Sequence, residues 1–99
     1  MWQVVTPKRF VKALAKCPEN VVSRVEELKE KLKKNPYIGE KLVGHKNFYR
    51  IRIGDYRLIY QVNKREKLVV LYDIAHRKNV YRFFLLFLSL VLLVYIFLL

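Results

Sequence analysis

The strongest constraint on the fold is the alternation of residue types in the segment FYRIRIGDYRLIY, residues 48–60. Apolar and basic side chains alternate along it, which is the pattern of a half-buried strand. At its centre, Gly54-Asp55 is a natural two-residue turn, because glycine accepts the positive φ that a twisted hairpin requires. The segment therefore predicts a β-hairpin in which Ile53 and Tyr56 flank the turn.

This register places Arg52 directly opposite Arg57, with Arg50 two residues along on the same face. Like charges that face each other across a strand pair destabilise it, and no acidic residue interleaves with these arginines in the hairpin. A bound anion would convert the repulsion into attraction, because guanidinium groups match the geometry of phosphate. We therefore expect a phosphate-binding face, open to solvent, with Ile59 and Gln61 beside the arginines. A solvated sheet face without function is the alternative.

The overall charge points to the same class of ligand. Lys and Arg number 20 against 8 Asp and Glu, a formal net charge of +12, which favours nucleic acid or an anionic membrane surface as partner. Segment 41–82 alone holds 11 basic and 3 acidic residues. The single Cys17 excludes an internal disulfide framework and a cysteine-rich zinc site, and fits a reducing cytoplasm.

Residues 1–82 predict one α+β domain. A short apolar strand at 2–5 precedes a helix that begins at Pro7 and a second helix that follows Pro18 and ends at Asn35-Pro36. A connecting loop leads to the hairpin, and an almost wholly apolar strand follows at 68–74. We expect a strand, an αα-hairpin and a three-stranded antiparallel meander with the helices on one face.

The domain closes with the segment AHRKNVYR, residues 75–82. If residues 77–81 form one helical turn, Arg77 and Tyr81 lie on the same face. Neighbouring cations favour the phenolate, which would lower the pKa of Tyr81 and make it usable as a base. Its ring could also stack on an unpaired nucleobase. His76 alone is more often a surface or capping residue.

These two segments, YRIRIGDYRLIYQV and AHRKNVYR, closely resemble the RelE/ParE toxin superfamily of prokaryotic toxin–antitoxin systems, and the resemblance spans nearly the whole domain. It implies the RelE-like fold and a cognate antitoxin partner. RelE-like members cut messenger RNA on the ribosome, so the resemblance implies contacts with mRNA and ribosomal RNA. ParE-like members inhibit DNA gyrase and generally lack the tyrosine near the C-terminus. Because Tyr81 is present, the resemblance favours an endoribonuclease, with the gyrase inhibitor as the alternative.

The resemblance also implies roles for individual residues. Arg50 and Arg52 fall where RelE-like enzymes hold basic residues around the scissile phosphate, and Arg57 and Arg77 fall on arginines that stabilise the developing negative charge. Tyr81 falls on the tyrosine that orients the nucleotide and takes the proton of the 2′-hydroxyl, which attacks its own phosphate without a metal or other cofactor. We further assign RNA or phosphate contacts to Lys41, Lys46, His76 and Lys78.

One departure affects the chemistry. The RelE-type pattern has lysines where this chain has Arg50 and Arg52. A lysine can lose its proton among other cations, whereas arginine in a protein does not. Proton transfer is therefore expected to rest on Tyr81, with His76 as the candidate acid, while the arginines bind phosphate and stabilise charge.

Residues 83–99 form an apolar tail of seventeen residues that carries no charge and a single polar side chain, Ser89. We expect an apolar C-terminal helix, which at this length reaches about 25 Å, just short of the ~30 Å hydrocarbon core. Basic residues directly before the tail favour keeping the domain on the cytoplasmic side. A membrane anchor, a helix buried in an oligomer and an extension without function remain open.

The tail generates the first prediction. If the tail is an anchor, the full chain should enter the membrane fraction of expressing cells, whereas a chain truncated after Arg82 should not; a tail buried in an oligomer should instead give a soluble assembly, because an exposed segment this apolar does not stay monomeric in water. Fractionation followed by immunoblotting measures the difference. A full chain that remains in the soluble fraction as a monomer would eliminate the anchor.

Overall fold

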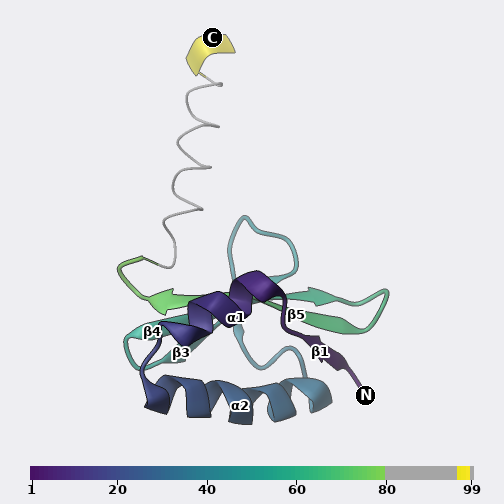
Figure 1. Cartoon of the computed structure of the whole chain (residues 1–99). Coiled ribbons are helices and arrows are strands. Elements are labelled where there is room, and N and C mark those ends of the chain that lie inside the picture. The colour runs from purple at the N-terminus through teal and green to yellow at the C-terminus, as the bar shows by residue number, and fades with distance from the viewer. Residues whose placement is uncertain (80–95, 99) are drawn as a thin grey trace.

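The computed structural model describes residues 1–79 and 96–98 of the chain, and it has the mixed architecture expected (Figure 1). Five strands form one sheet, with two helices packed against it. In chain order the elements are β1 (Gln3–Val5), α1 (Lys8–Ala15), α2 (Glu19–Lys34), β2 (Glu40–Lys41), β3 (Phe48–Ile53), β4 (Tyr56–Asn63) and β5 (Leu68–His76).

The sheet has the strand order β1-β5-β4-β3-β2. The three long strands form the expected antiparallel meander, and β1 adds a parallel edge beside the start of β5. The hairpin register is confirmed, because Ile53 pairs with Tyr56 and Arg52 pairs with Arg57. Gly54 has a φ of +58° and Asp55 does not have a positive φ, which is the pattern of a type II′ turn.

One face of the sheet, which we call the helix face, carries the main core. The apolar stripe of α2 packs there through four buried residues spaced three and four apart, Val21, Val25, Leu28 and Leu32. Leu58 and Tyr60 of β4 meet this stripe from the sheet. The opposite face, which we call the arginine face, carries Arg50, Arg52 and Arg57. The predicted alternation of the hairpin therefore separates the core from the charge.

Helix α1 lies along β5, where the short β1 does not reach (Figure 1). Its side chains contact residues of both faces of the sheet. Phe10 is fully buried in the main core. Its neighbour Arg9 places its guanidinium carbon 4.7 Å from the ring centroid of Tyr72, which belongs to the arginine face. The helix thus covers the open edge of β5.

A β-bulge in β5 determines which side chains in the second half of the strand point to the helix face and which point to the arginine face. Tyr60 pairs with Leu71, but the next residue of β4, Ile59, pairs with Asp73, so that Tyr72 is passed over. Because side chains alternate along a strand, the extra residue moves Ile74 rather than Asp73 onto the helix face. The bulge keeps an acidic side chain out of the core.

The strand β2 was not expected, because the sequence predicts a loop after Pro36. Tyr60 explains its position. The fully buried Tyr60 donates a hydrogen bond from its hydroxyl to the carbonyl oxygen of Pro36 at 2.7 Å and accepts one from the amide of Gly39 at 3.0 Å. A Cβ at position 39 would lie 2.7 Å from both the Tyr60 hydroxyl and the carbonyl oxygen of Arg50. The tyrosine therefore holds residues 36–39 against β3 and aligns Glu40 with Arg50.

Two expectations concern the end of the chain. The predicted helical turn at 77–81 lies only partly within the described residues, of which 77–79 form a turn, and most of the predicted apolar helix at 83–99 lies outside them. Residues 96–98 are helical and exposed. None of the helices within residues 1–79 and 96–98 is both long enough and apolar enough to cross a membrane.

The two hydrogen bonds of the Tyr60 hydroxyl generate the second prediction. Tyr60→Phe should lower the free energy of unfolding by about 1–3 kcal/mol, because it leaves two backbone groups without their partner. Urea denaturation measures the change, and Tyr37→Phe is the matched control, since Tyr37 is 45% exposed. Equal stability of Tyr60→Phe and wild type would show that the hydroxyl does not hold the loop.

The same residue also predicts a pH dependence. Burial raises the pKa of Tyr60 from 10.0 to about 12. The folded state therefore holds this proton more tightly than the unfolded chain, so the contribution is present below pH 10 and is lost as the pH rises towards 12. Wild type should lose stability more steeply over this range than Tyr60→Phe.

Candidate functional site

Three arginines of the hairpin define the centre of the arginine face. Arg52 and Arg57 face each other directly across β3 and β4, and Arg50 lies two residues before Arg52 on the same strand. Arg52 is exposed and makes no ion pair with any residue that the structure describes. Opposed guanidinium groups of this kind are suited to hold one anion between them.

Arg57 is fixed by the turn that precedes it. Its Nη1 donates hydrogen bonds to the carbonyl oxygen of Gly54 at 2.8 Å and to that of Tyr56 at 2.9 Å. The guanidinium is therefore held at the turn end of the hairpin. Arg57 has a structural role in the turn in addition to any role in binding, which the sequence pattern did not indicate.

An acidic residue also lies on this face, contrary to the expectation from the sequence. Glu40 of β2 pairs with Arg50 of β3, and its carboxylate accepts a hydrogen bond from the Arg50 guanidinium in an ion pair. That hydrogen bond, together with the charge of Arg50 and then of Arg52 and Arg57, lowers the pKa of Glu40. Residues 40–41 carry no strand pattern in the sequence, which therefore predicts a loop there and does not place Glu40 on this face.

Arg77 joins the arginines at the turn end. Its backbone amide donates a hydrogen bond to the carbonyl oxygen of Asp55 at 2.7 Å, and its Nε lies 3.9 Å from a carboxylate oxygen of the same residue. Arg77 also lies two residues beyond Ala75, which pairs with Arg57. The contact with Asp55 thus brings residue 77 beside the hairpin turn, at the end of the arginine face.

An apolar cluster lies beside the arginines. Ile59, expected to be open to solvent, is fully buried, and this expectation is wrong. Four partly buried side chains pack against it, namely Leu42, Phe48, Tyr72 and Ala75. The rings of Phe48 and Tyr72 meet edge to face with centroids 5.3 Å apart. The arginine face is therefore part aromatic and part charged, with the charged part at the Arg50–Glu40 pair, Arg52 and the turn.

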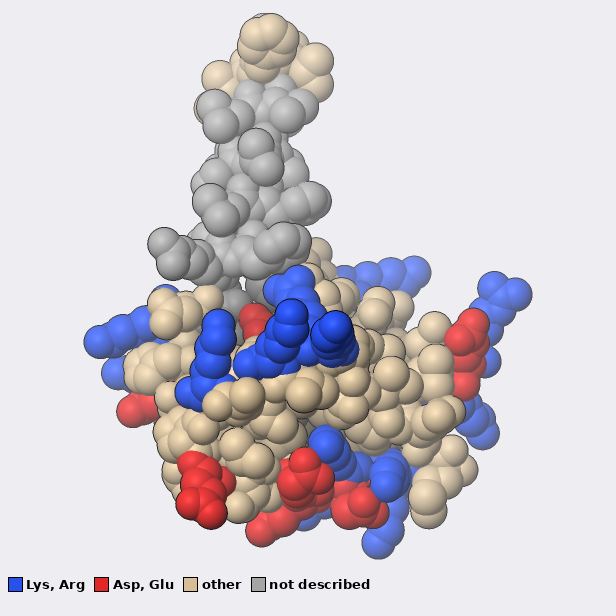
Figure 2. All heavy atoms as spheres, in the orientation of Figure 1, with Lys and Arg blue, Asp and Glu red and all other residues tan. Residues whose placement is uncertain are grey.

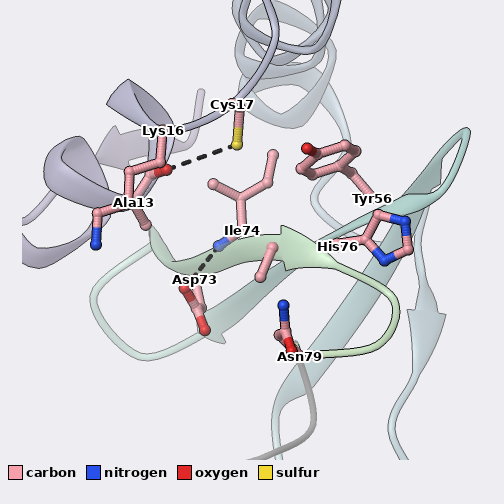
Figure 3. Close-up of a pocket in the computed structure, with 9 residues that line it drawn as sticks. Ala13, Lys16, Cys17, Tyr56, Asp73, Ile74, His76 and Asn79 are labelled. Carbon is pink, nitrogen blue, oxygen red and sulfur yellow. Dashed lines mark hydrogen bonds between the residues drawn. The ribbon is translucent and has the colours of Figure 1, made fainter.

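His76 lies on the helix face, away from the hairpin arginines. It pairs with Tyr56, and the two rings lie with centroids 5.6 Å apart (Figure 3). Its Nδ1 accepts a hydrogen bond from the amide of Lys78 at 3.3 Å. The bulge in β5 causes this placement, because it reverses the alternation for the residues that follow. The structure does not bring His76 together with the arginines.

His76 borders a cavity of about 380 Å³ between the end of α1 and β5 (Figure 3). The thiol of Cys17 lines the same cavity and donates a weak hydrogen bond to the carbonyl oxygen of Ala13. Burial, and then the charge of Asp73, raises the pKa of Cys17. The thiol therefore stays protonated at neutral pH, in line with a structural role.

The remaining predicted site residues are spread over the surface. Lys41 pairs with Tyr49 and so lies towards the helix face, whereas Lys46 and Lys78 are exposed in loops at 42–47 and 77–79. Tyr81 lies outside the described residues. Within residues 1–79 and 96–98, no group of His, Cys, Asp and Glu side chains is arranged to hold a metal ion.

The charges are distributed unevenly over the molecule. Figure 2 shows most of the acidic side chains at the bottom of the view, over α2, and basic side chains around the level of the sheet. The acids of α2 form ion pairs with bases of the same helix, as in Glu26 with Lys29 and Glu30 with Lys33. The basic excess is therefore left to the sheet and α1, where an anionic partner would bind.

Known proteins that match this chain are toxins of toxin–antitoxin systems. Residues 4–81 match the family model described as the ParE toxin of the type II toxin–antitoxin system parDE. Toxin RelE3 of Methanocaldococcus jannaschii is 30% identical over 88 residues, which cover 83% of this chain and 98% of that protein.

Two solved structures have the same fold. The RelB–RelE antitoxin–toxin complex from Methanococcus jannaschii has 29% identity and a TM-score of 0.69, covering 81% of this chain and 98% of its own. The archaeal RelE–RelB complex from Pyrococcus horikoshii OT3 has 32% identity and a TM-score of 0.68, covering 77% and 94%. The chain belongs to the RelE/ParE superfamily of toxins from type II toxin–antitoxin systems.

Proposed function

We propose that this chain is a toxin that cleaves messenger RNA on the ribosome, in the manner of the RelE-like members of its superfamily. The observation that carries the proposal is the direct opposition of Arg52 and Arg57 on an exposed sheet face. Such a pair is unfavourable by itself and becomes favourable around a phosphate. The names of the relatives, which include toxin RelE3, support the RelE-like reading.

The proposed reaction is a transesterification within the RNA. The 2′-oxygen attacks the adjacent phosphorus, the bond to the 5′-oxygen breaks, and the products carry a 2′,3′-cyclic phosphate and a 5′-hydroxyl. Arg52 and Arg57 hold the non-bridging oxygens, where negative charge develops. Arg77, held beside the turn by Asp55, approaches the same phosphate. By resemblance, Tyr81 orients the nucleotide and takes the 2′-hydroxyl proton.

A cognate antitoxin is the second partner in this proposal. Two of the solved relatives are complexes of RelE with RelB. A basic face that also carries the aromatic cluster of Phe48 and Tyr72 suits an acidic, partly apolar segment that folds as it binds. Binding there would cover the arginines and block RNA.

The name of the matching family model favours one alternative, a ParE-like inhibitor of DNA gyrase. Primer extension on a translated message separates the two functions. Wild type should produce new 5′ ends within codons on active ribosomes, and Tyr81→Phe should produce few or none. Intact message together with inhibited supercoiling by gyrase would favour the ParE-like function.

The arginine pair generates a mutational prediction. Arg52→Ala should lower the cleavage rate by about tenfold to a thousandfold, because a charge that stabilises the transition state is lost. Its thermal midpoint should stay the same or rise, because a like-charge contact is also removed. Arg65→Ala is the matched control, since Arg65 is an exposed residue in the turn between β4 and β5. A collapsed midpoint would mean that Arg52 is structural.

Arg57→Ala is expected to behave differently from Arg52→Ala. It should lose activity to a similar degree and also lose stability, because the hydrogen bonds to Gly54 and Tyr56 disappear. Arg57→Lys keeps the positive charge but not the guanidinium that bonds both carbonyl oxygens. This variant should therefore separate the loss of charge from the loss of the hydrogen bonds. Thermal denaturation and primer extension on the same preparations measure both.

The antitoxin generates a further prediction. Expression of the chain alone should arrest growth, and co-expression of a small acidic protein encoded beside it should relieve the arrest. The relief should weaken when Phe48 or Tyr72 is changed to a charged residue, because these rings form the apolar part of the face. Failure of every neighbouring acidic protein to relieve the arrest would argue against the partner.

A further inference from the structure

The cavity of about 380 Å³ between the end of α1 and β5 has no part in the proposed reaction. Its volume lies within the usual range of ligand pockets. Polar groups converge on it from the end of α1, from β4, and from β5 and the turn that follows (Figure 3). The lining residues that carry such groups are Lys16, Cys17, Tyr56, Asp73, His76 and Asn79. The cavity is therefore built by several elements rather than by one loop.

Part of the cavity wall is aromatic. Tyr56 and His76 are neighbours across β4 and β5, their rings lie edge to face with centroids 5.6 Å apart, and both residues line the cavity. Proteins that bind unpaired nucleobases stack them on aromatic side chains, tyrosine and histidine included. The two rings thus offer a flat base a surface against which it can pack.

Other lining residues offer hydrogen-bonding groups. The Oδ1 of Asp73 accepts a hydrogen bond from the amide of Ile74 at 2.9 Å, whereas its Oδ2 accepts none from the residues that the structure describes. Asn79 supplies a side-chain amide that donates and accepts, and its backbone amide is bonded to the carbonyl oxygen of His76 at 2.8 Å. Lys16 adds a charged donor. These groups can pair with the donors and acceptors on the edge of a nucleobase.

A row of lysines on α1 leads to this cavity. Lys8, Lys12 and Lys16, which we call the lysine row, are spaced four residues apart and so follow one face of the helix to its C-cap. All three are exposed, and none forms an ion pair with a residue that the structure describes. Residues 8–16 contain no acidic side chain. Such a row favours the phosphate backbone of a nucleic acid, and Lys16 connects it to the cavity.

The arginine face ends beside the same cavity. His76 lines the cavity, and the next residue, Arg77, is held beside the hairpin turn by Asp55. An RNA strand with phosphates on both the arginine face and the lysine row would therefore pass the cavity. A membrane surface, the other anionic partner of a lysine row, has no base to place there. The cavity thus favours RNA as the partner of the lysine row.

We propose that this cavity receives one unpaired nucleobase of the RNA, while Lys12 and Lys16 bind the adjoining phosphates. The assignment rests on the proposed ribonuclease function and adds a contact with its substrate. The base packs against the rings of Tyr56 and His76, and its edge bonds to Asn79 and Asp73. The lysines supply affinity for any sequence, and the cavity supplies preference among bases.

Cys17 reports on the cavity, because it is the single cysteine of the chain and lies in the lining. The probe is a short single-stranded 2′-O-methyl RNA, which lacks the attacking hydroxyl and is not cleaved. At about ten times its dissociation constant, it should slow alkylation of Cys17 by N-ethylmaleimide about tenfold. An oligomer of equal length with the sugar-phosphate backbone but no bases should not slow it. Mass spectrometry of the full chain measures the rate.

Two variants separate contacts with the base from contacts with phosphate. Asn79→Ala should weaken binding of the RNA about threefold to tenfold, because a hydrogen bond is lost, and leave binding of the base-free oligomer unchanged. Lys16→Gln should weaken binding of both, and lower the slope of log affinity against log salt by about 0.7, the value for one phosphate contact on a single strand. Lys64→Gln, an exposed lysine in the β4–β5 turn, is the matched control. Fluorescence anisotropy measures binding, and thermal midpoints verify folding.

Three results would overturn the proposal. The first is equal protection of Cys17 by the RNA and the base-free oligomer, and the second is protection by neither. The third concerns vesicles of phosphatidylcholine with phosphatidylserine. If Lys16→Gln weakens binding to these vesicles and leaves the affinity for the RNA unchanged, the lysine row binds a membrane surface.

Failure of the proposed function can be distinguished from failure of the base site, because the probe cannot be cleaved. If wild type cuts no message on active ribosomes but the RNA still protects Cys17, the ribonuclease function fails and the base site stands. If wild type cuts the message and Cys17 is not protected, only the base site fails.

Discussion

The register of the β3–β4 hairpin is the constraint on which the rest of the molecule depends. The turn at Gly54 and Asp55 pairs Ile53 with Tyr56, and every later pair along the two strands follows from it. Because the side chains of a strand alternate, this register sends one set to the helices and places the arginines on the opposite face. A slip of one residue in this register would turn the arginines towards the core that the sheet forms with α2. Hydrophobic burial on one face therefore holds like charges together on the other.

Much of this arrangement follows from the sequence, because the signals are local. The alternation of residues 48–60 and the glycine of the turn predicted the hairpin, its register and the opposition of Arg52 and Arg57. Val21, Val25, Leu28 and Leu32 recur in the sequence at helical spacing, and they form the buried stripe of α2. In both cases the spacing of the apolar residues matches the backbone repeat of the element, about two residues in a strand and about 3.6 in a helix.

The features that the sequence did not predict depend on contacts between distant residues. Glu40 and Lys41 have no strand pattern, and their pairing with β3 follows from Tyr60, about twenty residues later in the chain. The burial of Ile59 requires Phe48 and Tyr72 from two other strands. Such contacts become visible only once the sheet is assembled. The acidic member of the candidate site was missed for this reason.

The bulge at Tyr72 reverses the alternation of side chains along the rest of β5. Upstream of it, odd-numbered residues such as Val69 and Leu71 face the helices; downstream, Ile74 does. One extra residue thereby decides whether an imidazole or a guanidinium is presented beside the hairpin arginines. With the bulge, Arg77 follows Ala75 towards that face and His76 turns away. The same strand without the extra residue would place the imidazole of His76 on that face instead. A single-residue length change in one strand can thus exchange the guanidinium beside the hairpin for an imidazole without altering the hairpin arginines themselves.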